Sequence, residues 1–343
     1  MSHRRAFGTA ARRAMVAALV VTAVGVCALF VSAAWAAEKK AAKEATAPEG
    51  KGRSPTEVGT TNASYTETVG GVAMEMIWIP GGTFRMGSRM SPEEVVKKYG
   101  GAAGDEKRFQ DEHPVHEVEL DGFWLGKFEV TNAQFRKFRA SHSSREWEGR
   151  DLNGDNQPAV RVTWNDAKAF CDWLSEKTGK TYTLPTEAQW EYACRAGTET
   201  ERYWGDDDET MGRYANVLDH TGREAAKKFF EKNNVRWQEW FAANTTDDYV
   251  VSAPVGSFSP NKFGLYDMIG NVWEWCSDWY GEKYYGESPR RNPTGPATGA
   301  ARVLRGGSWI YAPWNARSAL RTWYSPSTRY YNIGFRVCRP PSP

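Results

Sequence analysis

The sequence predicts an α+β fold in which little of the chain forms regular secondary structure. The chain of 343 residues contains 16 Trp, 15 Tyr, 15 Phe and 32 Gly. This composition indicates a loop-rich core held together by large aromatic rings. Short stretches with strand-like alternation are separated by a few capped helical segments. Ala and Leu do not dominate after residue 70, which argues against an all-helical bundle.

Charge and length limit the classes of function. Lys and Arg number 44 and Asp and Glu number 42, which gives a formal net charge of +2. A nucleic-acid-binding protein is expected to carry a strong basic excess, so we expect no nucleic-acid partner. The length accommodates two average domains or one large domain with tails.

The N-terminus has the pattern of an export signal. Four arginines (Arg4, Arg5, Arg12 and Arg13) precede an almost wholly apolar or small stretch from 14 to 37. Ala34-Trp35-Ala36 fits a cleavage site, so residues 1–36 are predicted to be a signal peptide. The apolar stretch is long for a signal peptide, and residues 14–36 as an uncleaved membrane anchor remain an alternative. The cleaved signal peptide and the uncleaved anchor both predict that the folded domain is periplasmic or secreted.

The remaining chain divides at about residue 70. Residues 37–70 have little apolar content and are predicted to be a disordered linker, followed by one domain over 71–340. An oxidising compartment would permit disulfides. Sequence spacing leaves the pairing open among the four cysteines of the domain, Cys171, Cys194, Cys276 and Cys338.

Helix starts are the clearest local signals. A Ser, Thr or Asn cap precedes an amphipathic segment at four places, and one further segment is basic and amphipathic. We therefore expect helices after Ser91, Thr131, Asn165 and Thr186, and near 223–232. Strands are expected over 74–80, 83–87, 116–120, 123–130, 302–309 and 333–339.

The stretch Gly264–Trp275 fits neither a helical nor a strand period. Gly270-Asn271 predicts a turn with positive φ. One interpretation is an aromatic core hairpin. The other is a rigid loop in which backbone carbonyls and the side chains of Asn271 and Glu274 bind Ca²⁺, which prefers oxygen ligands.

Seven ordered blocks of the sequence resemble the sulfatase-modifying-factor family of formylglycine-generating enzymes. They cover roughly 72–339, the whole predicted domain. The blocks begin at Ile79, Glu129, Val162, Leu184, Asn261, Arg305 and Gly334 and include Leu184-Pro185-Thr186-Glu187-Ala188, Gly270-Asn271-Val272-Trp273-Glu274-Trp275 and Arg305-Gly306-Gly307-Ser308-Trp309. The resemblance implies the formylglycine-generating-enzyme variant of the C-type-lectin-like fold.

The resemblance also implies structural calcium. One family site corresponds to Gly270, Asn271, Val272 and Glu274, with Glu274 as the carboxylate. The second corresponds to Asn216, Val217, Asp247 and Tyr249. A family disulfide corresponds to Cys171 and Cys338, while Cys194 lacks its usual partner because Ser318 lies near that position.

The catalytic positions differ from the family pattern. Formylglycine-generating enzymes oxidise a substrate cysteine through two enzyme cysteines that bind copper. Here those positions hold Tyr311 and Ala316, and neither side chain is a thiolate ligand. We therefore expect no copper and no cysteine-based oxidase chemistry.

The residues around the two positions that lack the family's cysteines define a candidate pocket. It consists of Ser308, Trp309, Tyr311, Trp314, Arg317, Arg321 and Tyr330. Arg317 and Arg321 are suited to hold a carboxylate or phosphate, or are buried in ion pairs with core acids.

Two functions therefore remain open at the level of sequence. The first is a calcium-stabilised module that binds a protein, peptide or glycan. The second is an extracytoplasmic enzyme of the same superfamily with oxidative protein or peptide maturation chemistry. A membrane contact is expected only through an uncleaved N-terminal segment.

Overall fold

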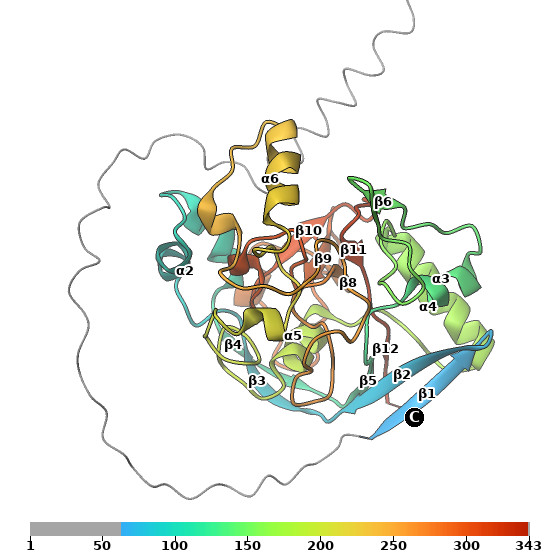
Figure 1. Ribbon diagram of the computed structural model, residues 1–343. Helices are drawn as coiled ribbons and strands as arrows, with labels where there is room; N and C mark the ends of the chain where they lie inside the picture. The colour runs from blue at the N-terminus through green and yellow to red at the C-terminus, as the bar shows by residue number, and fades with distance from the viewer. Residues whose placement is uncertain (1–62, 342–343) are drawn as a thin grey trace, which may run out of the picture. The chain divides into compact units, whose positions relative to one another are not determined.

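The computed structural model describes residues 63–341. The predicted signal peptide or anchor lies outside these residues. Within the described part, no helix is long and apolar enough to cross a membrane. The elements of this part are small and widely spaced along the chain (Figure 1).

Twelve strands form four sheets within 63–341. The first sheet has the order β1-β2-β5-β12 and is antiparallel throughout. The second has the order β10-β9-β8-β11, with β11 parallel to β8. Two-stranded sheets are formed by β3 with β4 and by β6 with β7. The strands are β1 (Ser64–Val69), β2 (Val72–Ile79), β3 (Gly82–Met86), β4 (His116–Leu120), β5 (Phe123–Gly126), β6 (Glu146–Trp147), β7 (Arg150–Asp151), β8 (Trp273–Trp279), β9 (Arg302–Arg305), β10 (Thr322–Tyr324), β11 (Ile333–Gly334) and β12 (Cys338–Arg339).

The caps predicted at Ser91, Thr131 and Thr186 are confirmed, whereas the helix expected after Asn165 begins at Trp164 with Thr163 as its cap. Four of them start at an N-cap side chain that accepts a hydrogen bond from the third helical residue, and each of those four has a reciprocal capping box. The helices are α2 (Pro92–Tyr99), α3 (Asn132–Phe138), α4 (Trp164–Thr178), α5 (Glu187–Arg195) and α6 (Arg223–Lys232). Short 3-10 helices occupy Asp105–Glu112, Met211–Arg213, Glu239–Phe241, Tyr284–Gly286 and Pro313–Asn315.

The predicted boundary of the domain needs a correction. β1 lies inside the predicted linker and pairs with β2 over its whole length. Tyr65, Glu67 and Val69 are half-buried while the residues between them are exposed. This alternation on a polar strand gives little apolar content, which is why composition suggested a linker. The folded part therefore includes residues 64–70.

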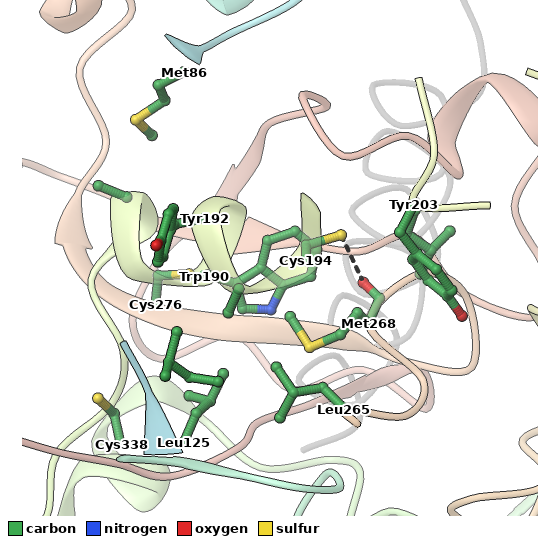
Figure 2. Close-up of a cluster of buried hydrophobic side chains, with 14 of the residues drawn as sticks. Met86, Leu125, Trp190, Tyr192, Cys194, Tyr203, Leu265, Met268, Cys276 and Cys338 are labelled. Atoms are coloured by element: carbon green, nitrogen blue, oxygen red, sulfur yellow. Dashed lines mark hydrogen bonds between the residues drawn. The ribbon is translucent and has the colours of Figure 1, made fainter. Parts of the chain in front are cut away.

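Two clusters of buried side chains form the core. Trp190, Trp273 and Trp275 are among the largest fully buried residues, and Trp190 belongs to the cluster drawn in Figure 2. α3 and α4 pack beside β1 and β2, while α6 projects at the top of the view in Figure 1. Eight of the twelve largest fully buried side chains are aromatic rings, in agreement with the composition.

Candidate functional site

Two glycines after β9 position the candidate site. Gly306 and Gly307 have φ values of 101° and 83°, a region that favours glycine. A Cβ on Gly307 would lie 2.9 Å from the carbonyl oxygen of Asn315. The turn brings the Trp309 backbone N–H to the carbonyl of Asn271, at 3.0 Å. The Gly-Gly segment and the Gly270-Asn271 turn are therefore directly joined.

Four of the residues predicted to line a pocket, Ser308, Trp309, Tyr311 and Tyr330, lie near one another in the structure. Ser308 is buried, and its Oγ accepts a hydrogen bond from Asn332 Nδ2 at 3.0 Å. Trp309 and Tyr311 follow it, and Tyr330 comes from the segment before β11. Their rings join a larger group that we call the aromatic cluster, which consists of Trp147, Phe229, Trp273, Trp309, Tyr311, Tyr324, Tyr330 and Tyr331.

Edge-to-face contacts hold the aromatic cluster together. Trp147 and Trp309 have ring centroids 4.8 Å apart with planes at 74°. Trp273 and Tyr311 are 5.4 Å apart at 86°. Such arrangements match the negative face of one ring to the positive edge of the next. Burial raises the pKa of Tyr311, and the neighbouring Tyr324 phenol raises it further. Tyr311 is therefore a neutral hydrogen-bonding group and not a phenolate.

Backbone strain surrounds Trp147. Arg145 and Glu148, on either side of it, have φ values of 59° and 46°. Arg161 also has a φ of 59°, and its backbone N–H donates to the Tyr330 carbonyl at 2.9 Å. Residues other than glycine in this region cost of order 1–3 kcal/mol each, and such residues concentrate at functional sites. The surrounding fold therefore holds the backbone next to the aromatic cluster in unfavourable conformations.

Arg317 and Arg321 lie outside the aromatic cluster. The guanidinium of Arg317 donates to both oxygens of Glu112, at 2.8 and 2.6 Å. That of Arg321 donates to both oxygens of Glu187, at 2.6 and 2.9 Å. Burial alone would lower the pKa of Arg317, but the Glu112 carboxylate raises it above the usual value. Both arginines are thus engaged in buried ion pairs, the alternative that the sequence left open.

Trp314 also belongs to a different part of the core. Its ring contacts Phe109 at 5.6 Å, on the 3-10 helix Asp105–Glu112. Of the seven residues predicted to line one pocket, only Ser308, Trp309, Tyr311 and Tyr330 therefore lie together. The side chains of Trp314, Arg317 and Arg321 instead contact Phe109, Glu112 and Glu187.

The expected disulfide is not formed in the structure. All four cysteines of the described residues are free and buried. Burial raises the pKa of Cys338 to about 12 and also raises that of Cys171, which Cys338 raises further as a neighbour. A thiolate is the species that forms disulfides and binds copper. Figure 2 shows Cys194, Cys276 and Cys338 among the apolar side chains around Trp190.

The second predicted calcium set surrounds an oxygen-rich group of side chains. Asp247 accepts backbone hydrogen bonds from Val217 at 3.1 Å and Tyr249 at 2.8 Å. Asn216 Oδ1 and Asp219 Oδ2 are buried and have no hydrogen-bond partner. Burial raises the pKa of Asp247 to about 8, and the Asp219 carboxylate contributes to the rise. Unpartnered oxygens and a destabilised carboxylate fit the hard-cation chemistry of Ca²⁺.

The first predicted calcium set has a different environment. Neither carboxylate oxygen of Glu274 is free, because Oε1 accepts from Arg336 and Oε2 accepts from Arg336 and Trp190. Asn271 Nδ2 donates to Glu129 at 2.8 Å. Asp267 Oδ1 nearby is buried without a partner, and burial raises the pKa of Asp267 to about 6. Asp267 rather than Glu274 is the carboxylate with a free oxygen.

No three or more His, Cys, Asp or Glu side chains in residues 63–341 form a metal-binding group. Any cation at the two predicted sets would therefore depend on backbone carbonyls and amide oxygens as well as on carboxylates. In the first predicted set, Gly270 and Val272 would supply backbone carbonyls. In the second set, Val217 and Tyr249 would do so.

Several residues of the site were missed at the level of sequence. Trp147 and Phe229 lie in segments outside the seven blocks, and Asp219 lies between two blocks. Glu129 and Asp267 are inside blocks but carried no separate signal. The pattern Arg145-Glu146-Trp147-Glu148-Gly149 offered one clue, since a glycine two residues after a large ring suggests a tight turn.

Comparisons with known proteins establish the family of this chain. Residues 62–341 match the family described as sulfatase-modifying factor enzyme 1-like domain. This chain belongs to the sulfatase-modifying-factor family. A formylglycine-generating enzyme of Streptomyces coelicolor is 35% identical over 310 residues, which cover 75% of this chain and 87% of that protein. The formylglycine-generating enzyme of Mus musculus is 30% identical over 315 residues, covering 76% and 74%.

A solved structure supports the same membership. PvdO from Pseudomonas aeruginosa superposes with a TM-score of 0.60 at 29% identity, covering 78% of this chain and 95% of PvdO. Within the sulfatase-modifying-factor family, the fold expected from the sequence, a variant of the C-type-lectin-like fold, is confirmed. The aromatic cluster contains one of the two positions where the resemblance places catalytic cysteines, Tyr311.

Proposed function

We propose that this sulfatase-modifying-factor domain is an exported, calcium-stabilised binding module without formylglycine-generating oxidase activity. Its binding site is the aromatic cluster. The observation that carries the proposal is the combination of Tyr311 and Ala316 at the family's cysteine positions with four buried thiols elsewhere. The copper chemistry of formylglycine-generating enzymes needs a pair of soft thiolate ligands at the reaction centre.

The burial of the cysteines supports this proposal. Cys194 lies among apolar side chains, with its Sγ 3.9 Å from the Met268 carbonyl and 3.6 Å from Ser318 Oγ. Burial raises the pKa of Cys194 to about 12. A thiol of this kind is a small hydrophobic side chain at neutral pH. It is not suited to replace a catalytic cysteine without a rearrangement of the core.

In this proposal, calcium stabilises the folded domain and takes no part in catalysis. The residues that would hold it in the second set are Asn216, Val217, Asp247 and Tyr249, with Asp219 as an additional carboxylate. In the first set, Gly270 and Val272 would supply carbonyls and Asp267 the free carboxylate oxygen. A divalent cation at either place would compensate buried negative charge.

A direct assay tests the absence of oxidase activity. The full chain is incubated with copper, oxygen and a cysteine-containing sulfatase peptide, and the peptide mass is followed. We expect no conversion, whereas an authentic formylglycine-generating enzyme converts the same peptide in parallel. Conversion of the peptide thiol to an aldehyde by this chain would overturn the proposal and favour the alternative of oxidative peptide maturation.

The export part of the proposal is tested separately. Fractionation of cells that express the full chain is expected to place it in the periplasm or the medium. Removal of residues 1–36 should retain it in the cytoplasm. Retention of the intact chain in the membrane fraction would favour the uncleaved anchor at 14–36.

A further inference from the structure

An open cavity of about 290 Å³ is lined by residues of α2, of the segment before it and of the loop that follows α5 (Figure 1). Met90 and Lys98 come from the α2 side, and Glu201 and Asp206 come from the loop. None of the lining residues belongs to the aromatic cluster. The volume is at the lower end of the range for ligand pockets, so the cavity suits a ligand about as large as one side chain.

Glu201 places a buried carboxylate in the wall of this cavity. Its side chain is 8% exposed, and its Oε2 lies 3.4 Å from Arg317 Nη1. Arg317, however, already donates to both oxygens of Glu112. Among residues 63–341, no donor binds Glu201 Oε1. One guanidinium therefore faces two carboxylates, and a further cation in the cavity would compensate the excess negative charge.

Asp206 brings a second carboxylate to the cavity. Its Oδ1 accepts a hydrogen bond from the Glu201 backbone N–H at 2.8 Å, and no described residue donates to its Oδ2. Lys98 Nζ approaches the Asp206 carbonyl at 3.4 Å and pairs with no carboxylate of the described residues. Arg89 and Glu199, both more than half exposed, neutralise each other at 2.6 Å. Two carboxylates therefore face the single positive charge of Lys98.

The wall of the cavity favours an alkyl ammonium over other cations. No three or more His, Cys, Asp or Glu side chains of the described part form a group that could hold a metal ion. A guanidinium binds best to both oxygens of one carboxylate, and Glu201 has only one oxygen free. An ammonium is a compact charge that bonds to single oxygens. The half-buried Met90 offers a flexible apolar surface to an alkyl stem.

We propose that this cavity binds an alkyl ammonium group, with Glu201 Oε1 and Asp206 Oδ2 as acceptors. A lysine side chain of a peptide and a free alkyl amine both present this group. The inference goes beyond the proposed function, because it depends neither on the aromatic cluster nor on calcium. The Ser318 backbone N–H donates to the Glu201 carbonyl at 2.8 Å. An occupant of the cavity would therefore lie beside the segment that contains Ala316.

Titration calorimetry of the full chain at low salt tests the proposal. The probe n-butylamine represents a free amine, and N-acetyl-lysine amide represents a peptide side chain. N-acetyl-norleucine amide has an alkyl stem without the charge. We expect both ammonium probes to bind, and the neutral probe to bind roughly tenfold more weakly or less. The tighter of the two ammonium probes identifies the source of the group, and added salt should weaken both.

Charge variants give effects of opposite sign. Glu201→Gln should weaken ammonium binding roughly tenfold, and Asp206→Asn, at an exposed position, about threefold. Lys98→Gln removes the opposing charge and should strengthen binding about threefold. A structural role of Lys98 alone would not produce this gain. As matched controls, Asp207→Asn and Lys97→Gln change exposed neighbours that do not line the cavity, and should leave the affinity unchanged.

The possible outcomes separate this proposal from the proposed function. Absence of binding by both ammonium probes, equal binding of the neutral probe, or binding that all three charge variants leave unchanged would overturn the ammonium site. A melting curve establishes that Glu201→Gln is folded. If it is not, the opposite effects expected for Asp206→Asn and Lys98→Gln decide the question. Copper-dependent oxidation of a cysteine peptide would instead overturn the proposed function and leave the ammonium site standing.

Discussion

Arg336 and Glu274 form a buried, two-point ion pair at the centre of the fold. Arg336 Nη2 lies 2.6 Å from Glu274 Oε1, and Arg336 Nε lies 2.7 Å from Oε2. Trp190 Nε1 also donates to Oε2, at 2.9 Å. The pair connects β8 with the segment that follows β11, and the tryptophan brings in α5. Both charged side chains are almost completely inaccessible.

Removal of one partner of this pair should destabilise the protein strongly. Glu274→Gln would leave the Arg336 guanidinium buried with a weaker acceptor, and Glu274→Ala would leave it with none. We expect Glu274→Ala to lower the free energy of unfolding by about 3–5 kcal/mol, measured by chemical denaturation. The double variant Glu274→Ala/Arg336→Met should recover part of this loss, because no buried charge remains unpaired.

An exposed pair provides the control for that experiment. Glu75 binds Lys127 at 2.9 Å, and its side chain is 46% exposed. Glu75→Ala should change the free energy of unfolding by less than about 1 kcal/mol. Equal losses from Glu75→Ala and Glu274→Ala would contradict the central role of the buried pair.

Local signals in the sequence predicted most of the helices correctly. Thr186 and Gln189 form the capping box at the start of α5, and Gly179 ends α4 in the left-handed conformation. These capping features are formed by residues only three or four positions apart, so they can be recognised from the local sequence alone. Strand lengths were predicted less well. The expected strand over 123–130 ends at Gly126, where the chain bonds to residues beyond 330 instead.

The candidate site depended on contacts that are distant in sequence. Ser308 and Trp309 were found because they adjoin the Gly-Gly turn of a recognisable block. Trp147 is 162 positions away from Trp309, and no local pattern links the two. The roles of Arg317 and Arg321 likewise depend on Glu112 and Glu187, whose approach is set by tertiary packing. Sequence therefore identified some residues of the candidate site but not the side chains that surround them.

Asp278 should make stability depend on pH. It is buried and accepts hydrogen bonds from the Glu187 backbone N–H and from Ser277 Oγ. Burial raises the pKa of Asp278 to about 7, and the Glu187 carboxylate contributes to the rise while Arg321 opposes it. The folded state then binds a proton that the unfolded state releases near pH 4.

The sign of this effect follows from the raised pKa. Between about pH 4 and pH 7 the folded state holds more protons than the unfolded state, so the free energy of unfolding falls as pH rises. Asp278→Asn should flatten this slope, and the exposed control Glu282→Gln should not. Denaturation midpoints measured at several pH values test this, and an unchanged slope in Asp278→Asn would count against the assignment.

The four buried thiols should resist alkylation in the folded protein. Burial raises the pKa of Cys276 well above its usual value, as it does for the other three cysteines. In a Cys27→Ser background, we expect iodoacetamide to label none of them before unfolding. A Ser257→Cys variant places a thiol at an exposed position and should react rapidly.

The same experiment decides the disulfide. After unfolding without a reductant, the structure predicts that Cys171 and Cys338 are labelled, because both are free. Peptide mapping by mass spectrometry identifies the labelled positions. A pair that stays unlabelled until reductant is added would establish the bridge that the family resemblance implies.

Removal of calcium should destabilise the folded protein through the second set of oxygens. With Asp219 and Asp247 close together and both pKa values raised by burial, a bound cation would replace protons as the compensating charge. At a free calcium concentration of about 100 times the dissociation constant, binding to the folded state alone would contribute about 2.7 kcal/mol. We therefore expect a chelator to lower the melting temperature of the wild-type chain. Asp247→Asn should remove most of this difference, whereas the exposed neighbour Asp248→Asn should keep it. If the wild-type chain melts at the same temperature with and without the chelator, the second set does not bind calcium.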